Sequence, residues 1–184
     1  MNREVIFMKQ FYILTAFGKD RPGIVADVSE VVAKSGGNIE DSRMALLGEH
    51  FTLMVLLTGN GIYEDLIIGT ERLQNEKGLV IHLSTVERNK PYDDAVPANY
   101  EIRVFGEDRE GIVARITRIL STNAINIVSL KSKIEPAPIS GTPIFTLSAE
   151  LVAPPSADMK KLRDVMADIE DEMNLEIAIS RIID

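Results

Sequence analysis

The sequence "FGKDRPGIVADV" at residues 17–28 returns further along the chain as "FGEDREGIVARI" at residues 105–116. The similarity continues past this stretch, because Asn-Ile at residues 38–39 returns as Asn-Ile at residues 126–127. A repeat at a constant offset is the signature of a duplicated structural unit. The sequence therefore predicts two copies of one domain.

Each copy predicts a strand followed by a helix. The run "YEIRVF" at residues 100–105 alternates apolar and polar side chains, as a half-buried strand does, and its counterpart is "FYILTAF" at residues 11–17. The helix that follows has apolar residues at the same places in both copies, which predicts one buried face. These residues are Ile24, Val25, Val28, Val31 and Val32, and Ile112, Val113, Ile116, Ile119 and Leu120.

The rest of each copy predicts a hairpin, a second helix and a last strand. Gly48-Glu49 forms a plausible two-residue turn, and the helix after it is expected at residues 62–77. In the second copy Ser156 is the expected N-cap. The order βαββαβ, present twice, predicts an α+β protein of two ferredoxin-like domains, each an antiparallel sheet with helices on one face. Because the strands are apolar on both sides, we expect the other face to be covered by the sister domain or a second chain.

The domain limits follow from the repeat and from composition. We expect domain 1 at residues 9–87, a linker at residues 88–98 and domain 2 at residues 99–184. The linker region is rich in charged residues and contains two prolines, as short exposed connections often do.

Composition excludes several classes of function. The chain has 184 residues, no cysteine and a net charge of -8, so it has no disulfides or thiolate metal sites and no basic stripe to follow a nucleic acid. The apolar patch at residues 1–8 is too short for a signal peptide, and no run is long enough to cross a membrane. We expect a cytoplasmic protein that binds neither membranes nor nucleic acid directly.

The repeated loop at residues 18–23 does not match a phosphate-binding loop. Gly18 and Gly23 have the spacing of a Walker motif, but Ile24 and Val25 stand where Lys and Ser/Thr are required. The loop also lacks the G-x-G-x-x-G pattern of dinucleotide sites.

A structural interpretation accounts for most of this loop. Gly18 would leave the strand with a positive φ, and Pro22 would start the first helical turn. Asp20 would cap the helix or act as a first-turn acid that favours the helix dipole. Gly23 would allow a close approach of helix to strand or of backbone to ligand. This interpretation explains Arg21 less well.

The alternative is a site for a small zwitterion. Free amides at the helix N-terminus would hold its carboxylate, while Asp20 and Asn38 would accept hydrogen bonds from its ammonium group. Both interpretations remain open from the residues alone.

Catalytic and metal chemistry are not expected. The two histidines, His50 and His82, do not recur in the other copy, and neither stands near a recognisable serine and acid. No set of residues has metal-ligand spacing. We therefore predict no catalytic residue, no metal, no cofactor and no enzyme activity.

The motifs "DRPGIVA" and "GGNIEDSRMALLGEHFTLMVLL" in a duplicated βαββαβ chain resemble tandem ACT-domain proteins, and more narrowly the glycine cleavage system transcriptional repressor family. The resemblance implies an amino-acid-responsive repressor that acts through a transcriptional activator protein rather than on DNA, with glycine or a similar amino acid as ligand and a homodimer as assembly. The alternative is an ACT assembly module that senses nothing.

ACT domains bind amino acids at interfaces between modules, through the loop after the first strand and the start of the second. Carried onto this sequence, the implied ligand-binding positions are Asp20, Arg21, Pro22, Gly23, Asn38, Asp108, Arg109, Gly111 and Asn126. Glu110 replaces Pro22 in the second copy and adds a negative charge, so we expect the first copy to be the better site.

Overall fold

The computed structural model describes residues 9–87 and 97–182, and the chain divides into two compact units, residues 1–91 and 92–184. The described parts of these units are called module 1 and module 2, and each is described by itself. The predicted linker lies almost entirely outside the described residues, as does the apolar patch at the N-terminus. The predicted domain limits therefore remain predictions.

Both modules have the predicted order βαββαβ. Module 1 consists of β1 (Gln10–Lys19), α1 (Ile24–Lys34), β2 (Asn38–Leu47), β3 (His50–Gly59), α2 (Tyr63–Lys77) and β4 (Val80–Val86). Module 2 consists of β5 (Tyr100–Glu107), α3 (Ile112–Thr122), β6 (Asn126–Pro136), β7 (Pro143–Val152), α4 (Met159–Met173) and β8 (Leu175–Arg181). The fold class is confirmed.

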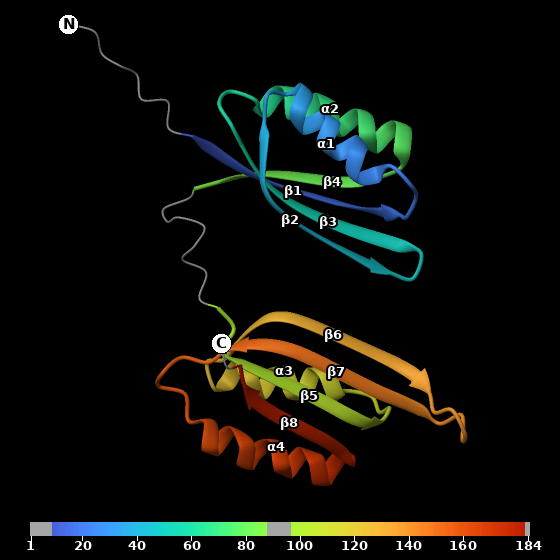
Figure 1. Cartoon of the computed structure of the whole chain (residues 1–184), viewed down its shortest axis with the longest axis vertical. Coiled ribbons are helices and arrows are strands. Elements are labelled where there is room, and N and C mark those ends of the chain that lie inside the picture. The colour runs from blue at the N-terminus through green and yellow to red at the C-terminus, as the bar shows by residue number, and fades with distance from the viewer. Residues whose placement is uncertain (1–8, 88–96, 183–184) are drawn as a thin grey trace, which may run out of the picture. The chain divides into compact units, whose positions relative to one another are not determined.

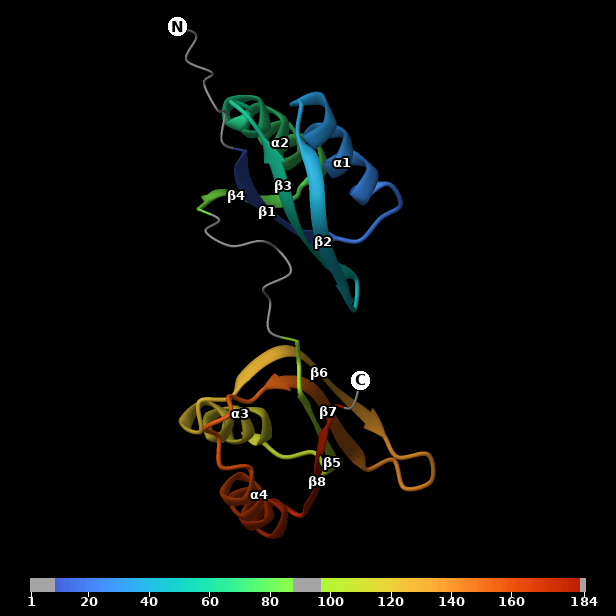
Figure 2. The same ribbon diagram turned by 60° about the vertical axis from the view of Figure 1, so that its left-hand side comes forward.

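Each module has one antiparallel sheet of four strands. The strand orders are β2-β3-β1-β4 and β6-β7-β5-β8, so the first strand of each copy is central and the second lies at an edge. Helices α1 and α2 cover one face of the first sheet, and α3 and α4 cover one face of the second (Figures 1 and 2). Because β3 is antiparallel to both β1 and β2, those two strands run in the same direction.

The core of each module lies between the sheet and its helices. In module 1, Tyr12, Leu14 and Ala16 alternate along β1 with more exposed residues and are at most 1% exposed. The predicted helical face is largely confirmed. Val25 and its counterpart Val113 are the exceptions, because they are 46% and 37% exposed on the first turn, beyond the edge of the core.

The two loop glycines are special, but their predicted roles are exchanged. Gly18 lies inside β1, and an added Cβ would come within 2.8 Å of Leu79 Cδ2, so it is the residue that allows close approach. Gly23 has a φ of 90° and is the N-cap of α1, so it needs the left-handed conformation. Module 2 repeats both features at Gly106 and Gly111.

The predicted roles of Ser156 and Pro22 at helix starts were wrong. Asp158 caps α4 through hydrogen bonds from the amides of Lys160 and Lys161. Ser156, the predicted cap, lies in a turn closed by the Ala157 amide, which donates to the Pro154 carbonyl at 2.9 Å. Pro22 precedes the N-cap of α1 and is not in its first turn.

Candidate functional site

In module 1 the loop at residues 20–23 joins the end of β1 to the start of α1. The Asp20 amide donates to the Glu49 carbonyl at 2.8 Å and ties the loop to the β2–β3 turn. Contrary to the prediction, Asp20 does not cap α1, because Gly23 is the N-cap and within the part of the chain that the structure describes no side chain caps this helix. The first amides of a helix have no partner within the helix, so this end of α1 presents donors.

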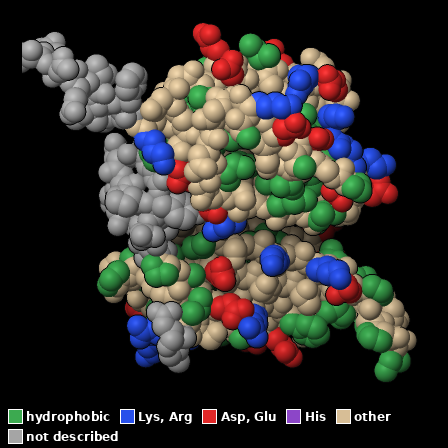
Figure 3. All heavy atoms as spheres, turned by 45° about the horizontal axis from the view of Figure 1, so that its top comes forward, with side chains coloured by type: hydrophobic (Ala, Val, Ile, Leu, Met, Phe, Trp, Pro, Cys, Tyr) green, Lys and Arg blue, Asp and Glu red, His purple; other side chains and the backbone are tan. Residues whose placement is uncertain are grey.

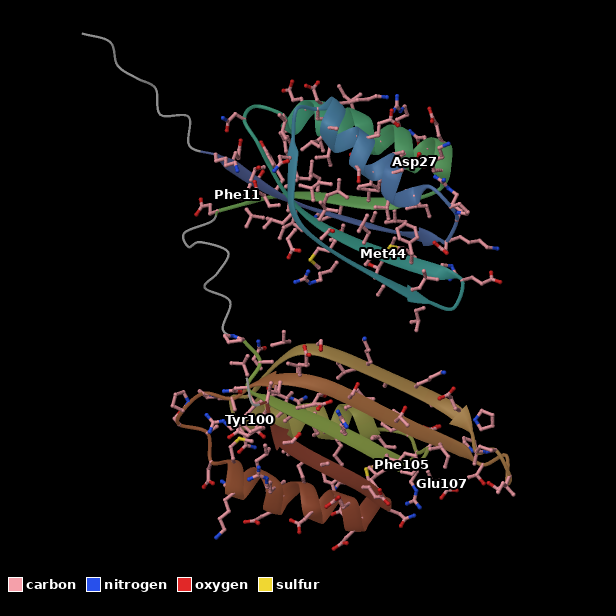
Figure 4. The ribbon with its side chains drawn as sticks, viewed as in Figure 1. Phe11, Asp27, Met44, Tyr100, Phe105 and Glu107 are labelled. Atoms are coloured by element: carbon pink, nitrogen blue, oxygen red, sulfur yellow. The ribbon has the colours of Figure 1, made fainter. Side chains whose placement is uncertain are left out.

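The guanidinium of Arg21 is already paired. Its Nη2 donates to Asp27 Oδ2 at 2.5 Å, and its Nη1 donates to the Pro22 carbonyl at 3.2 Å. The hydrogen bond from Arg21 lowers the pKa of Asp27, which lies on the first turns of α1 (Figure 4). The pair links loop to helix and draws the Arg21 cation toward Asp27.

In module 2 the arginine of the equivalent loop, Arg109, is less tightly paired than Arg21 is in module 1. Position 115, which is equivalent to Asp27, is an arginine, and it pairs with Glu172 on α4. The described carboxylate paired with Arg109 is that of Glu107, at a long distance of 3.9 Å. The Asp108 amide donates to the Pro143 carbonyl at 3.0 Å, so the backbone of the loop is anchored as in module 1.

A hollow of about 480 Å³ opens beside this second loop. One side is formed by the loop and the first turn of α3, and the other by the second half of β6 with Phe145 of β7. Its lining residues are Asp108, Arg109, Gly111, Ile112, Val113, Ala114, Ser132, Lys133, Ile134 and Phe145. Three of the predicted ligand-binding residues therefore line one hollow, together with helix amides and a hydroxyl group.

Asn38 and Asn126 do not join these loops within a module. Each asparagine is the first residue of an edge strand, at the opposite end of α1 or α3 from the loop. Eleven residues of helix separate the two ends, a distance of about 16 Å. A single small ligand therefore cannot contact both the loop and the asparagine of one module.

Asn38 instead belongs to a polar cluster around Glu40. Glu40 accepts hydrogen bonds from Lys9 Nζ at 2.7 Å and Thr58 Oγ1 at 2.8 Å, with Asn38 Nδ2 at 3.5 Å. Glu40 is the extra residue of a bulge in β2, because the register with β3 shifts between Ile39 and Asp41. These hydrogen bonds lower the pKa of Glu40 to about 2, and the bond from Lys9 has the largest effect.

Sequence reasoning did not identify Ser132 or Lys133 as part of the site. Their place depends on how β6 pairs with β7 and passes beside α3, and the sequence has no local signal for that register. It also missed a pair on β4, where Ser84 Oγ lies 2.8 Å from His82 Nε2. Among the described residues no carboxylate is hydrogen-bonded to His82, so the pair does not form a catalytic triad.

Within residues 9–87 and 97–182 no group of three or more histidine, aspartate or glutamate side chains could hold a metal ion. No described helix has the length and hydrophobicity that crossing a bilayer requires.

Comparisons with known proteins agree with one another. The family model of the ACT domain matches residues 10–76. The glycine cleavage system transcriptional repressor of Escherichia coli is 30% identical over 174 residues, covering 94% of this chain and 90% of that protein.

Solved structures match over both modules. The crystal structure of an unknown protein from Galdieria sulphuraria superposes with a TM-score of 0.78 at 28% identity, covering 96% of this chain and all of that one. A structure provisionally assigned as a glycine cleavage system transcriptional repressor gives a TM-score of 0.68 at 22% identity and covers 96% and 99% of the two chains. At that identity the second match supports the fold alone.

Proposed function

The chain belongs to the family of glycine cleavage system transcriptional repressors, and we propose that it is an amino-acid-responsive repressor of glycine cleavage genes. In this proposal it acts by contact with a transcriptional activator protein rather than by binding DNA. The observation that carries the sensing half is the hollow beside α3, where Asp108, Arg109 and Gly111 meet the first helical amides.

The chemistry of this hollow suits a small zwitterion such as glycine. Amides at the N-terminus of α3 and the loosely paired Arg109 would hold the carboxylate. The carboxylate of Asp108 would accept hydrogen bonds from the ammonium group. The hollow favours the second copy as the binding module, whereas the charge of Glu110 favoured the first.

Indirect action on DNA agrees with the charge of the chain. The net charge is -8, and on the face drawn in Figure 3 basic and acidic side chains are interspersed. Proteins that follow a phosphate backbone rely on clustered Lys and Arg. We therefore propose a protein partner, with the chain acting in the cytoplasm as a homodimer and having no catalytic role.

Calorimetric titration with glycine, alanine and serine tests the sensing half. Arg109→Gln removes the charge at nearly constant size, and we expect it to weaken binding about tenfold, the effect of losing one charge-assisted hydrogen bond. The matched control is Arg103→Gln, because Arg103 lies on β5 in the same module and pairs with Glu101, outside the hollow. Equal losses in the two variants would contradict the proposed site.

The alternative function is an ACT assembly module without a ligand. It predicts no heat with any amino acid at millimolar concentration and no effect of Arg109→Gln beyond stability. Co-purification with a transcriptional activator, with and without glycine, tests the regulatory half separately.

A further inference from the structure

The two sheets differ in chemistry on the face that points away from the helices, called here the open face. In module 1 the open-face residues of β1, β3 and β4 alternate with the core residues and pair with one another across the strands. The apolar members used in this argument are Ile13, Phe17, Met54, Leu56 and Val80. Phe17, Met54 and Val80 are 50%, 51% and 65% exposed.

Module 2 has charged or polar residues at the same positions of its open face. The strand pairing places Glu101 where module 1 has Ile13, Ser148 where it has Met54, Glu150 where it has Leu56, and Glu176 where it has Val80. Phe105 is the one apolar residue retained in this set, at the position of Phe17 (Figure 4). Glu101 also accepts two hydrogen bonds from Arg103, at 2.8 and 3.0 Å.

We propose that the open face of module 1 is the dimer surface of this protein and packs on the same face of a second copy. This inference rests on the proposed homodimer and assigns its contact to one face of one module. The open face of module 2 takes no part in the contact.

The distribution of charged residues favours a second copy of this chain, rather than a face like that of module 2, as the partner of the open face of module 1. Covering the apolar face with one like that of module 2 would bury Glu150, Glu176 and the Arg103–Glu101 pair without new partners, and burying charges in this way is costly. A second module 1 face instead supplies apolar side chains against apolar side chains. The charges that border it are paired with each other: Arg43 with Asp41 on the edge strand β2 at 2.9 Å, and Lys19 at the end of β1 with Glu49 at 3.2 Å.

The polar groups inside the face are compatible with burial. The Ser84 hydroxyl and the His82 ring are hydrogen-bonded to each other at 2.8 Å, which removes much of the cost of taking them out of water. The remaining polar residues include His50, which stacks on an aromatic ring of the face, and Thr15 and Thr52, which are small and neutral.

The size of the face fits a dimer. The strands β1, β3 and β4, spaced about 4.8 Å apart and paired over residues 11–17 of β1, give a projected area on the order of 300 Å², and the edge strand β2 brings it to about 450 Å². Because side chains project from the sheet, the solvent-accessible area of the face is larger than its projected area. It approaches the ~800 Å² that each partner buries in a standard interface. Two sheets can pack face to face about 10 Å apart.

Light scattering coupled to size exclusion tests the surface with two matched variants. Met54→Lys and Ser148→Lys place the same charge at equivalent positions of the two open faces. We expect the wild type and Ser148→Lys to have the mass of a dimer and Met54→Lys that of a monomer, with circular dichroism showing both variants folded. A wild-type dimer that survives Met54→Lys, or that Ser148→Lys also dissociates, would overturn the assignment.

Cysteine cross-linking gives a second readout that does not depend on dissociation. The native chain has no cysteine, so Thr15→Cys places one thiol at the middle of the central strand, where an isologous two-fold contact brings it near its own copy. Because the packed sheets are about 10 Å apart, too far for a direct disulfide, we expect a short bismaleimide cross-linker to give a covalent dimer with Thr15→Cys and none with the equivalent Arg103→Cys. A monomeric wild type would overturn both the dimer and the surface while leaving the amino-acid titration unaffected, whereas failure of that titration leaves the surface standing.

Discussion

Gly106 lies so close to Asn174 that a Cβ on Gly106 would come within 2.9 Å of the Asn174 carbonyl oxygen. The same Cβ would come within 2.7 Å of Leu175 Cδ2. The equivalent glycine of module 1, Gly18, meets the end of the Leu79 side chain at 2.8 Å but finds the nearest backbone oxygen only at 3.8 Å. In both modules the glycine allows a close approach of the neighbouring segment. The nearest atoms are partly backbone at Gly106 but the end of a side chain at Gly18, so the neighbour of Gly106 is the more rigid.

This difference predicts unequal effects of the same substitution. We expect Gly106→Ala to lower the free energy of unfolding by about 1–3 kcal/mol, the cost of overpacking against an immovable neighbour. Gly18→Ala should cost less, because the Leu79 side chain can rotate. Scanning calorimetry of the full chain measures both, and a larger loss for Gly18→Ala would contradict the explanation.

A second prediction concerns the glycine at the helix N-cap. Gly111 has a φ of 87° and nothing lies within 4 Å of an added Cβ, so substitution there strains the backbone without a steric clash. We expect Gly111→Ala to cost about 1–2 kcal/mol, the penalty for an ordinary residue in the left-handed region. Gly111→Asn should cost less, since asparagine tolerates that region better. Equal losses for the two, measured by urea unfolding, would mean that the φ is not the cause.

These glycines show which features of the fold can be predicted from the sequence and which cannot. The repeat and its hydrophobic periodicity were sufficient to predict both modules, because each buried face is encoded locally by spacing. Gly18 and Gly23 were identified as special positions, but a glycine that needs positive φ and one that needs space look alike in sequence. In the structure they are distinguished by the packing of Leu79 against β1 and by the φ of 90° at Gly23.

The site was predicted less well for a topological reason. Asp108, Arg109 and Gly111 were predicted together and line one hollow, because they are neighbours in the chain. Asn126 was grouped with them, yet α3 carries the chain to the other end of the module before β6 begins. Ser132 reaches the hollow through the register of β6, which depends on long-range pairing.

The Arg21–Asp27 pair predicts unequal binding by the two modules. The pKa of Asp27 is lowered by its hydrogen bond with Arg21, so the pair is ionised at neutral pH and Arg21 is occupied. We expect the wild type to bind about one amino acid per chain, at module 2, since a paired cation recognises a carboxylate poorly. Asp27→Asn should release Arg21 and raise the stoichiometry seen by calorimetry.

Asp41→Asn is the matched control for that experiment. Asp41 lies on β2, where it pairs with Arg43 rather than with Arg21. A wild type that already binds two equivalent ligands, or a control that also raises the stoichiometry, would contradict the role given to Asp27.

Glu40 predicts how module 1 responds to acid. Its pKa falls from an ordinary 4.5 to about 2 because Lys9 and Thr58 donate to the carboxylate. A carboxyl group whose pKa is lower in the folded state stabilises the fold above its unfolded pKa, and this contribution disappears as pH falls through the folded value. Glu40→Gln should therefore lower the melting temperature by a few degrees at pH 7, and the difference from wild type should vanish between pH 4.5 and about 2.

The control for Glu40 is Glu49→Gln, because Glu49 is highly exposed and pairs with Lys19 across 3.2 Å. Exposed pairs contribute little, so this variant should melt close to wild type throughout the same pH range. Melting curves followed by circular dichroism at several pH values compare the three proteins. A Glu40→Gln difference that stays constant down to pH 2 would mean that the carboxylate charge does not hold Lys9 and Thr58, and that the cluster acts through packing alone.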